Sequence, residues 1–198
     1  MSAEVRAAKE VLRREVRARL RGLSAEARAC ESGRIRERLE TSLAFQRARC
    51  VLGYVALGSE PDVWEVLERA MARGVEVAVP RWDEGLRAYA AVRAPRAGEW
   101  VIGPHGAREP GAEATVLAFE RLDLVLVPGL AFDRSGRRLG RGHGYFDRML
   151  ARATQALRWG IGWDLQVVDA VPAEAHDMSM DALVTPGGWD AVTSRSGV

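Results

Sequence analysis

Short apolar runs alternate with helix-like segments along this chain, and this alternation constrains the fold more than any other feature. The run DLVLV at residues 123–127 is the clearest candidate for a buried strand. Further apolar runs that favour strands lie at residues 50–57, 75–79, 86–92, 158–163 and 182–185. Apolar strands that alternate with helices are typical of a mostly parallel sheet with both faces covered. The pattern therefore predicts an α/β protein whose mostly parallel sheet carries helices on both faces.

Four segments repeat apolar side chains at the spacing of a helix. They cover residues 4–20, 24 to about 41, 61–73 and about 145–157. Ser24 is placed to cap the second helix, whereas Pro61 is placed to open the third and Gly74 to end it. Residues 94–114 are rich in Pro and Gly, which predicts a long loop with little regular structure.

The composition places the chain among globular proteins. With 198 residues and 47% hydrophobic side chains it can bury one core, so residues 1–198 are predicted to form a single domain. The longest nearly uncharged apolar stretch, residues 124–132, is much shorter than the roughly 18 residues of a membrane span. Two cysteines cannot form a disulfide framework, and acidic residues in the Arg-rich N-terminal segment argue against a transit peptide. We therefore expect a cytoplasmic monomer that binds no membrane.

Lysine is almost absent from the basic residues. Of 29 basic residues 28 are Arg, and Lys9 is the single Lys. An ammonium group is a compact point charge that the planar guanidinium does not reproduce, so Lys9 is a candidate for a specific role. Lys9, Arg13 and Arg17 follow at four-residue spacing, which also fits a solvated basic face, and a surface helix residue adds little to stability. The net charge of +2 does not indicate a protein that coats nucleic acid.

A glycine-rich segment follows the strand at 123–127. Gly140, Gly142 and Gly144 alternate, with arginines on both sides of them. Backbone N–H groups of glycines can approach an anion closely, and a helix that starts after Gly144 would add its positive end. The pattern is neither a Walker A loop nor a GxGxxG fingerprint. It fits a phosphate and metal site with Asp147 as a ligand, and it also fits a hairpin before a helix whose dipole Asp147 offsets.

A longer run that includes these glycines resembles the signature of a known family. It reads VPGLAFD at 127–133, Gly136, RLGRG at 138–142 and GYFDR at 144–148. This order resembles that of 5-formyltetrahydrofolate cyclo-ligases, also called methenyltetrahydrofolate synthetases. The resemblance covers nearly the whole chain, with further matches at Lys9, Leu12, Arg13, Glu60, Pro80, Arg81, Gln166, Pro172, His176, Asp177, Asp181 and Thr185. Two residues depart from the pattern: His143 stands where Gly or Lys is common, and Phe146 where a second Tyr is common.

The resemblance implies a reaction that depends on ATP and Mg²⁺. In the family, the formyl oxygen of 5-formyltetrahydrofolate attacks the γ-phosphate of ATP, which gives an imidate phosphate and ADP. N10 then closes the ring, and phosphate leaves to give 5,10-methenyltetrahydrofolate. Such chemistry needs in-line positioning of the reactants and neutralisation of charge on the phosphate oxygens. The implied partners are therefore ATP, Mg²⁺ and a reduced folate.

The resemblance also implies roles for individual residues. The implied ATP contacts are Lys9, Arg13, Arg138, Leu139, Gly140, Arg141, Gly142, His143, Gly144, Tyr145 and Phe146. The implied folate contacts are Val55, Glu60, Arg141, Gly142, His143, Gly144 and Tyr145. Arg141 and Tyr145 are the implied catalytic residues, and Asp147 and Asp177 are the implied Mg²⁺ ligands. The departure at His143 leaves its contact with the nucleotide open.

Several alternatives stay open at this stage. Glu60 fits an acid near the start of a helix, and Tyr145 fits a core aromatic residue. A phosphosugar isomerase or acyl-CoA transferase of similar architecture would need no ATP. A nucleic-acid-binding module on the first two helices is a further alternative, although the interleaved acidic residues argue against it. His105 and His143 lie too far apart in the sequence to indicate a zinc site.

Overall fold

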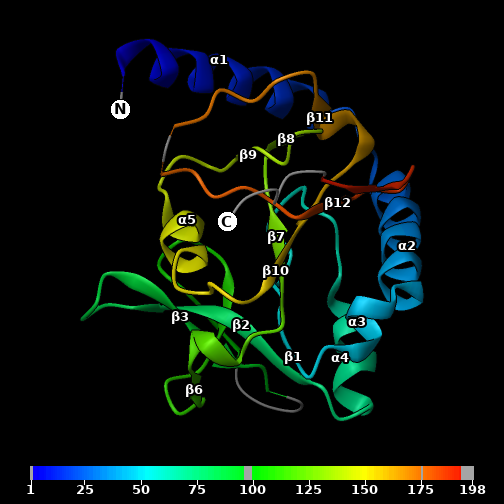
Figure 1. Ribbon diagram of the computed structural model, residues 1–198, viewed down its shortest axis with the longest axis vertical. Helices are drawn as coiled ribbons and strands as arrows, with labels where there is room; N and C mark the ends of the chain where they lie inside the picture. The colour runs from blue at the N-terminus through cyan, green and yellow to red at the C-terminus, as the bar shows by residue number, and fades with distance from the viewer. Residues whose placement is uncertain (1, 96–99, 175, 193–198) are drawn as a thin grey trace.

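The computed structural model describes residues 2–95, 100–174 and 176–192. Its centre is an eight-stranded sheet in which β12, β10, β7, β1 and β2 run parallel (Figure 1). In spatial order the strands are β13 (Trp189–Ala191), β12 (Ala182–Val184), β10 (Leu157–Ile161), β7 (Leu124–Pro128), β1 (Cys50–Leu52), β2 (Glu76–Asp83), β3 (Ala88–Arg93) and β6 (Val116–Leu117). The three remaining pairings, β12 with β13, β2 with β3 and β3 with β6, are antiparallel. The predicted mostly parallel sheet is confirmed.

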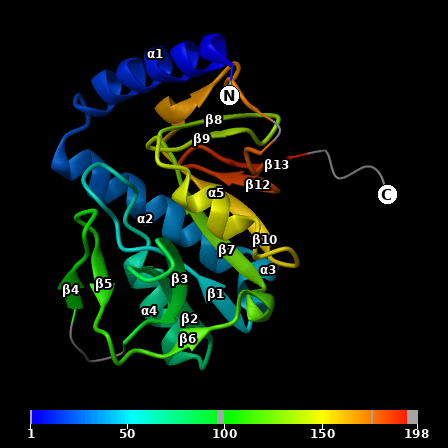
Figure 2. The ribbon, with the colours of Figure 1, turned by 90° about the vertical axis from the view of Figure 1, so that its left-hand side faces the viewer.

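Both faces of this sheet are covered. Along β7, Leu124 and Leu126 face one buried cluster, whereas Val125 and Val127 face the other. The first cluster is closed by α2 (Ala25–Thr41), α3 (Leu43–Arg47) and α4 (Trp64–Ala72). The second is closed by α5 (Tyr145–Leu150), which Figure 2 shows over the sheet, and by the short 3₁₀ helix η1 (Phe119–Arg121). Because side chains alternate between the faces of a strand, the continuous apolar run of β7 requires cover on both sides.

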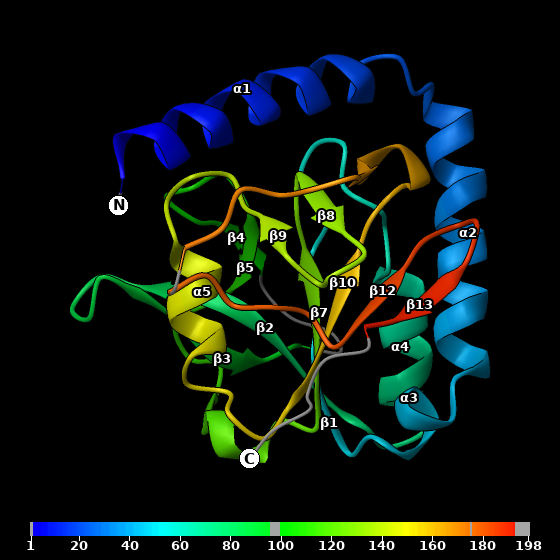
Figure 3. The ribbon, with the colours of Figure 1, turned by 45° about the horizontal axis from the view of Figure 1, so that its top comes forward.

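Helix α1 (Ala3–Leu20) lies across the end of the molecule, above β8 (Ala131–Asp133) and β9 (Arg138–Leu139) (Figure 3). It is fastened by Val16 and Leu20, which are 0% and 4% exposed. Ser24 caps α2 as predicted, because its hydroxyl oxygen accepts a hydrogen bond from the Ala27 N–H at 3.1 Å. Among the described residues, no helix is long and apolar enough to cross a membrane.

Two predicted boundaries near the start of the sheet are wrong. Strand β1 ends at Leu52 and does not continue to residue 57, because the chain turns away after Gly53, whose N–H makes a last sheet bond to Ala78 O at 2.9 Å. Helix α4 begins at Trp64 and not at Pro61. The Pro61 carbonyl accepts a hydrogen bond from the buried Tyr54 hydroxyl at 2.9 Å, which holds residues 53–61 as a loop at the carboxyl end of β1.

Two further predictions are corrected. Helix α5 ends at Leu150 and not at Leu157, because Leu157 joins β10, where its N–H donates to Asp123 O at 2.9 Å. The segment predicted as a loop at 94–114 contains a hairpin of β4 (Trp100–Ile102) and β5 (Arg108–Pro110), although residues 96–99 lie outside the described part. A small third sheet joins β8 to β9 and to β11 (Val167–Val168), which follows the 3₁₀ helix η2 (Asp164–Gln166).

Candidate active site

The glycine-rich segment follows a tight turn between β8 and β9, which come directly after β7 in the chain. Asp133, which is 2% exposed, fixes the turn between β8 and β9. Its Oδ1 accepts hydrogen bonds from the N–H groups of Ser135 and Arg137 at 2.9 and 3.1 Å, and its Oδ2 accepts one from Val171 at 2.8 Å. These bonds compensate a buried carboxylate, and they set the path on which the chain enters the loop.

The loop itself, residues 138–144, requires glycine at two positions. Gly142 and Gly144 have φ angles of 119° and 65°, a region that residues with a Cβ rarely adopt. Helix α5 starts directly after Gly144, but it is only six residues long. The predicted contribution of a helix dipole therefore comes from a much shorter helix than expected.

Two cavities open on either side of this loop. We call the first, of about 310 Å³, the aromatic cavity; its walls include Val55, Glu60, Tyr89, His105, Arg141, Tyr145 and Phe146. We call the second, of about 620 Å³, the charged cavity; its walls include Arg6, Lys9, Glu10, Arg13, Leu139, Gly142, Arg148, Glu174, His176 and Asp177. Arg138, Gly140, His143, Gly144 and Asp147 line both. The glycine-rich loop is therefore the shared wall of two neighbouring sites.

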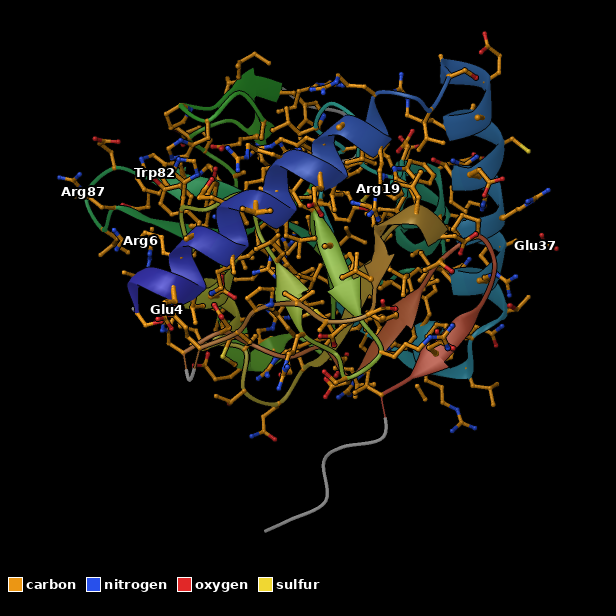
Figure 4. The ribbon with its side chains drawn as sticks, turned by 90° about the horizontal axis from the view of Figure 1, so that it is seen from above. Glu4, Arg6, Arg19, Glu37, Trp82 and Arg87 are labelled. Carbon is orange, nitrogen blue, oxygen red and sulfur yellow. The ribbon has the colours of Figure 1, made fainter. Side chains whose placement is uncertain are left out.

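Tyr145 is the centre of a cluster of rings in the aromatic cavity. Its ring centroid lies 4.7 Å from that of His105, 5.3 Å from His143, 5.0 Å from Trp82 and 5.6 Å from Tyr89. Seen from above, Trp82 lies on the β2–β3 hairpin, closer to the body than Arg87 (Figure 4). Tyr145 is half-buried and lines a cavity, so its interpretation as a core residue is wrong. Such a cluster presents ring faces and edges that suit a flat heterocycle.

Glu60 and Arg141 form an ion pair at the aromatic cavity. Glu60 Oε1 accepts hydrogen bonds from Arg141 Nη2 and Nε at 2.8 and 3.1 Å, while Oε2 accepts one from the Leu57 N–H at 2.9 Å. The Glu60 side chain is 13% exposed and that of Arg141 is 45% exposed. Because α4 begins at Trp64, Glu60 is not an acid at a helix start, and that alternative is wrong.

Lys9 is buried in the charged cavity, with 6% of its surface exposed. Its Nζ donates to Asp177 Oδ2 at 2.6 Å and to Glu174 Oε2 at 3.4 Å. Burial raises the pKa of Asp177, but the hydrogen bonds from Lys9 and from the Glu174 N–H, with the charge of Lys9, outweigh it and lower that pKa. The interpretation of Lys9 as part of a solvated face is therefore wrong, although Arg17 is exposed at the edge of the aromatic cavity.

Two buried arginines make polar contacts in and beside the glycine-rich loop. The Nε of Arg13, a residue that is 8% exposed, donates to Gly140 O at 3.0 Å, and its Nη1 is paired with Glu10. Arg138 Nη2 donates to Asp147 Oδ1 at 2.9 Å, and the Arg138 side chain is 3% exposed. Its Nε is buried without a hydrogen-bond partner among the described residues, so this guanidinium retains one unused donor beside both cavities.

The carboxylates of Asp147 and Asp177 fit the donor set of Mg²⁺. Both line the charged cavity, and each is held by a cation, Arg138 or Lys9. Mg²⁺ is bound through one or two carboxylates together with substrate phosphates. Within residues 2–95, 100–174 and 176–192, no cluster of three or more His, Cys, Asp or Glu side chains is placed to hold a metal. The pair therefore suits an ion that arrives with further oxygen ligands on a substrate.

Every residue to which the resemblance assigns a role in binding or catalysis lines one of the two cavities. The division of these residues between the two cavities differs from the expectation. Arg141, Tyr145 and Phe146 line the aromatic cavity alone, whereas Gly142 lines the charged cavity alone. The Leu139 side chain is buried in the core, so its backbone is the part that faces the charged cavity.

The sequence did not reveal several residues of the site. The rings of Trp82, Tyr89 and His105 were missed, and His105 was missed because the hairpin that carries it was predicted as a loop. The rings of His105 and His143, judged too far apart in the sequence, have centroids 6.1 Å apart. The signal that was available is the apolar alternation of β3 and the GPHG turn at 103–106, which together indicate a hairpin over the sheet edge.

This fold and site define a class of α/β enzyme in which one glycine-rich loop separates two ligand cavities. A sequence profile of the 5-formyltetrahydrofolate cyclo-ligase family matches residues 5–186. A mouse 5-formyltetrahydrofolate cyclo-ligase is 28% identical over 91% of this chain and 94% of its own length. The enzyme of that name from Mycolicibacterium smegmatis is 36% identical over 70% of this chain and 74% of its own length.

A solved structure agrees with this match. The NMR structure of Aquifex aeolicus 5,10-methenyltetrahydrofolate synthetase superimposes with a TM-score of 0.84 at 28% identity, covering 96% of this chain and 95% of that one. The chain therefore belongs to the 5-formyltetrahydrofolate cyclo-ligase family, which is a family of ligases.

Proposed function

We propose that the protein converts 5-formyltetrahydrofolate and ATP to 5,10-methenyltetrahydrofolate, ADP and phosphate in the presence of Mg²⁺. The observation that carries this proposal is the pair of cavities on the two sides of one glycine-rich loop. A reaction between a heterocycle and a triphosphate needs two such sites in contact. Membership of the cyclo-ligase family supports the same conclusion.

The aromatic cavity is the proposed site of the reduced folate. Its volume of about 310 Å³ is within the range of small-molecule sites. The pterin ring carries amine and amide donors, and Glu60 supplies a half-buried carboxylate that can accept from them. Val55 and the Tyr145 ring would pack against the apolar faces of the ligand.

The charged cavity is the proposed site of the ATP phosphates. Lys9 and Arg13 are buried cations on its wall, and the N–H groups of the glycine-rich loop add uncharged donors. Asp147 and Asp177 would hold Mg²⁺, which neutralises charge on phosphate oxygens when bound. Without a cation between them, these carboxylates would repel the same phosphates.

The proposed reaction takes place beside the glycine-rich loop, which lines both cavities. The formyl oxygen attacks the γ-phosphorus, the bond to the β-phosphate oxygen breaks, and ADP leaves. N10 then attacks the activated formyl carbon and releases its proton, and phosphate departs with the former formyl oxygen. Arg141 is proposed to stabilise the transferred phosphoryl group, because its half-exposed guanidinium lies at the loop and is already oriented by Glu60. Tyr145 is proposed to hold the folate ring beside it.

An absorbance assay for methenyltetrahydrofolate tests this proposal. We expect the product to form from 5-formyltetrahydrofolate only when ATP and Mg²⁺ are both present. Formation without ATP, or no formation with any divalent cation, would overturn it. The alternative of a phosphosugar isomerase or acyl-CoA transferase has no support from the relatives found. A single domain over residues 1–198, a monomeric state, a cytoplasmic location and the absence of nucleic-acid or membrane partners stay part of this proposal.

A further inference from the structure

We propose that Glu109 is a positioning residue for the folate site, and this inference rests on the proposed function. Glu109 lies on β5, in the β4–β5 hairpin, and does not itself line either cavity. Tyr89 and His105 do line the aromatic cavity, and together with Trp82 they belong to the ring cluster around Tyr145. Its proposed role is to fix two of these rings and the backbone of a third, so that the aromatic cavity has the correct shape before folate binds.

The contacts of Glu109 are those of a fixed carboxylate. It is 2% exposed, and its Oε2 accepts a hydrogen bond from the Trp82 N–H at 2.9 Å, which ties β5 to β2. Its Oε1 is buried and has no hydrogen-bond partner among the described residues. Leaving a buried acceptor unpaired destabilises the folded state.

The hairpin turn is shaped around this carboxylate. A Cβ placed on Gly103 would lie 2.2 Å from Glu109 Oε1, so no other residue fits there without displacing the carboxylate. The Gly103 N–H donates to Ala107 O at 2.8 Å and closes the turn that carries His105. The position of the His105 ring therefore depends on the position of the Glu109 carboxylate.

The polar groups that face Glu109 are residues of the ring cluster and one arginine. Burial raises the pKa of Glu109, and the Trp82 N–H, His105, Arg81 and Tyr89 oppose that rise. Burial and the Glu109 carboxylate in turn raise the pKa of Tyr89, whose phenol therefore keeps its proton. Tyr89 and His105 both line the aromatic cavity. Glu109 is thus proposed to fix these two cavity-lining rings, although it does not line the cavity itself.

The first test is the effect of Glu109→Gln on the two substrates separately. The amide keeps the shape of the side chain but removes its charge. We expect the KM for 5-formyltetrahydrofolate to rise about tenfold, which corresponds to about 1.4 kcal/mol of binding free energy at 25 °C. The KM for ATP and kcat should stay within about twofold of the wild type, because the charged cavity is untouched. Equilibrium dialysis with 5-formyltetrahydrofolate alone should show the same loss of affinity.

Asp123→Asn is the matched control. Asp123 is a carboxylate that accepts hydrogen bonds from the N–H groups of Arg49 and Cys50, and it lies at the start of β7, away from both cavities. The variant should lose thermal stability and leave both KM values unchanged. If Glu109→Gln leaves the folate KM unchanged, or raises both KM values together as the melting temperature falls, Glu109 has only a structural role.

A second variant decides the case in which Glu109→Gln does not fold. Tyr89→Phe removes only the hydroxyl that faces the carboxylate, and it should raise the folate KM several-fold. Where Glu109→Gln does fold, the same change in its background should have no further effect, because the two groups act as one unit. Full additivity, or an unchanged folate KM in Tyr89→Phe, would overturn the inference. A wild-type protein that makes no methenyltetrahydrofolate would overturn the proposed function itself, which separates the two failures.

Discussion

Replacing Lys9 with Ala is expected to weaken both the fold and ATP binding. The sequence predicted little effect on stability, but Lys9 Nζ lies 2.6 Å from Asp177 Oδ2 and the two side chains are 8% and 16% exposed. A hydrogen bond to a charged group contributes roughly 1.5–3 kcal/mol. Because the Glu174 N–H still donates to Asp177 at 2.7 Å in the variant, we expect a loss of about 2 kcal/mol. For a chain of this length that lowers the melting temperature by about 4–8 °C.

The pH dependence of this loss identifies its cause. The folded-state pKa of Asp177 lies below its usual value of 3.8, so its contribution to stability is present above that value and is lost as the pH falls through the folded-state pKa. The stability difference between Lys9→Ala and the wild type should therefore be full at about pH 7 and shrink below about pH 4. Urea unfolding at several pH values measures it.

Arg14→Ala is the control for this experiment, because Arg14 is an exposed residue of the same helix. It should change stability by less than about 0.5 kcal/mol at any pH. Calorimetric titration with ATP should show weaker binding to Lys9→Ala and a partial recovery in Lys9→Arg. A loss of stability that does not depend on pH, or ATP affinity equal to that of the wild type, would refute the assignment of Lys9 to both roles.

Four further substitutions test the two cavities. Glu60→Gln should raise the KM for 5-formyltetrahydrofolate much more than that for ATP; equal changes in steady-state kinetics would remove Glu60 from the folate site. Asp147→Asn and Asp177→Asn should each abolish turnover at ordinary Mg²⁺ and shift its titration to higher concentrations, and an unchanged Mg²⁺ dependence of either would exclude that residue as a ligand. Gly142→Ala should cost about 1 kcal/mol in thermal unfolding, since its φ is 119°, and reduce ATP affinity. Wild-type stability and affinity in that variant would show that the loop tolerates a Cβ.

The strands and the glycine-rich loop could be predicted because their signals are local. The run at β7 is apolar on both faces, and the alternating glycines of residues 140–144 permit backbone conformations that other residues avoid. The turn residues Ser24 and Gly74 mark helix ends for the same reason. Each of these features is decided by neighbours in the sequence.

The pairing of charges could not be predicted, because it depends on segments that are distant along the chain. Lys9 is buried by residues near Asp177, and Glu60 is oriented by Arg141; the hydrogen-bonded partners are 168 and 81 positions apart. The predicted boundaries of α4 and α5 are wrong for a related reason. The Tyr54 hydroxyl donates a hydrogen bond to the Pro61 carbonyl, and Leu157 pairs with β7 in the sheet. Tertiary contacts override local preference at these places.

A single stoichiometry measurement decides whether the two cavities serve one coupled reaction. Purified protein is mixed with ATP, Mg²⁺ and limiting 5-formyltetrahydrofolate, and ADP and methenyltetrahydrofolate are quantified in the same samples over time. We expect one ADP for each methenyltetrahydrofolate formed, and no release of ADP when the folate is left out. Release of ADP without folate, or cyclised folate without ADP, would contradict the claim that the glycine-rich loop joins the two sites.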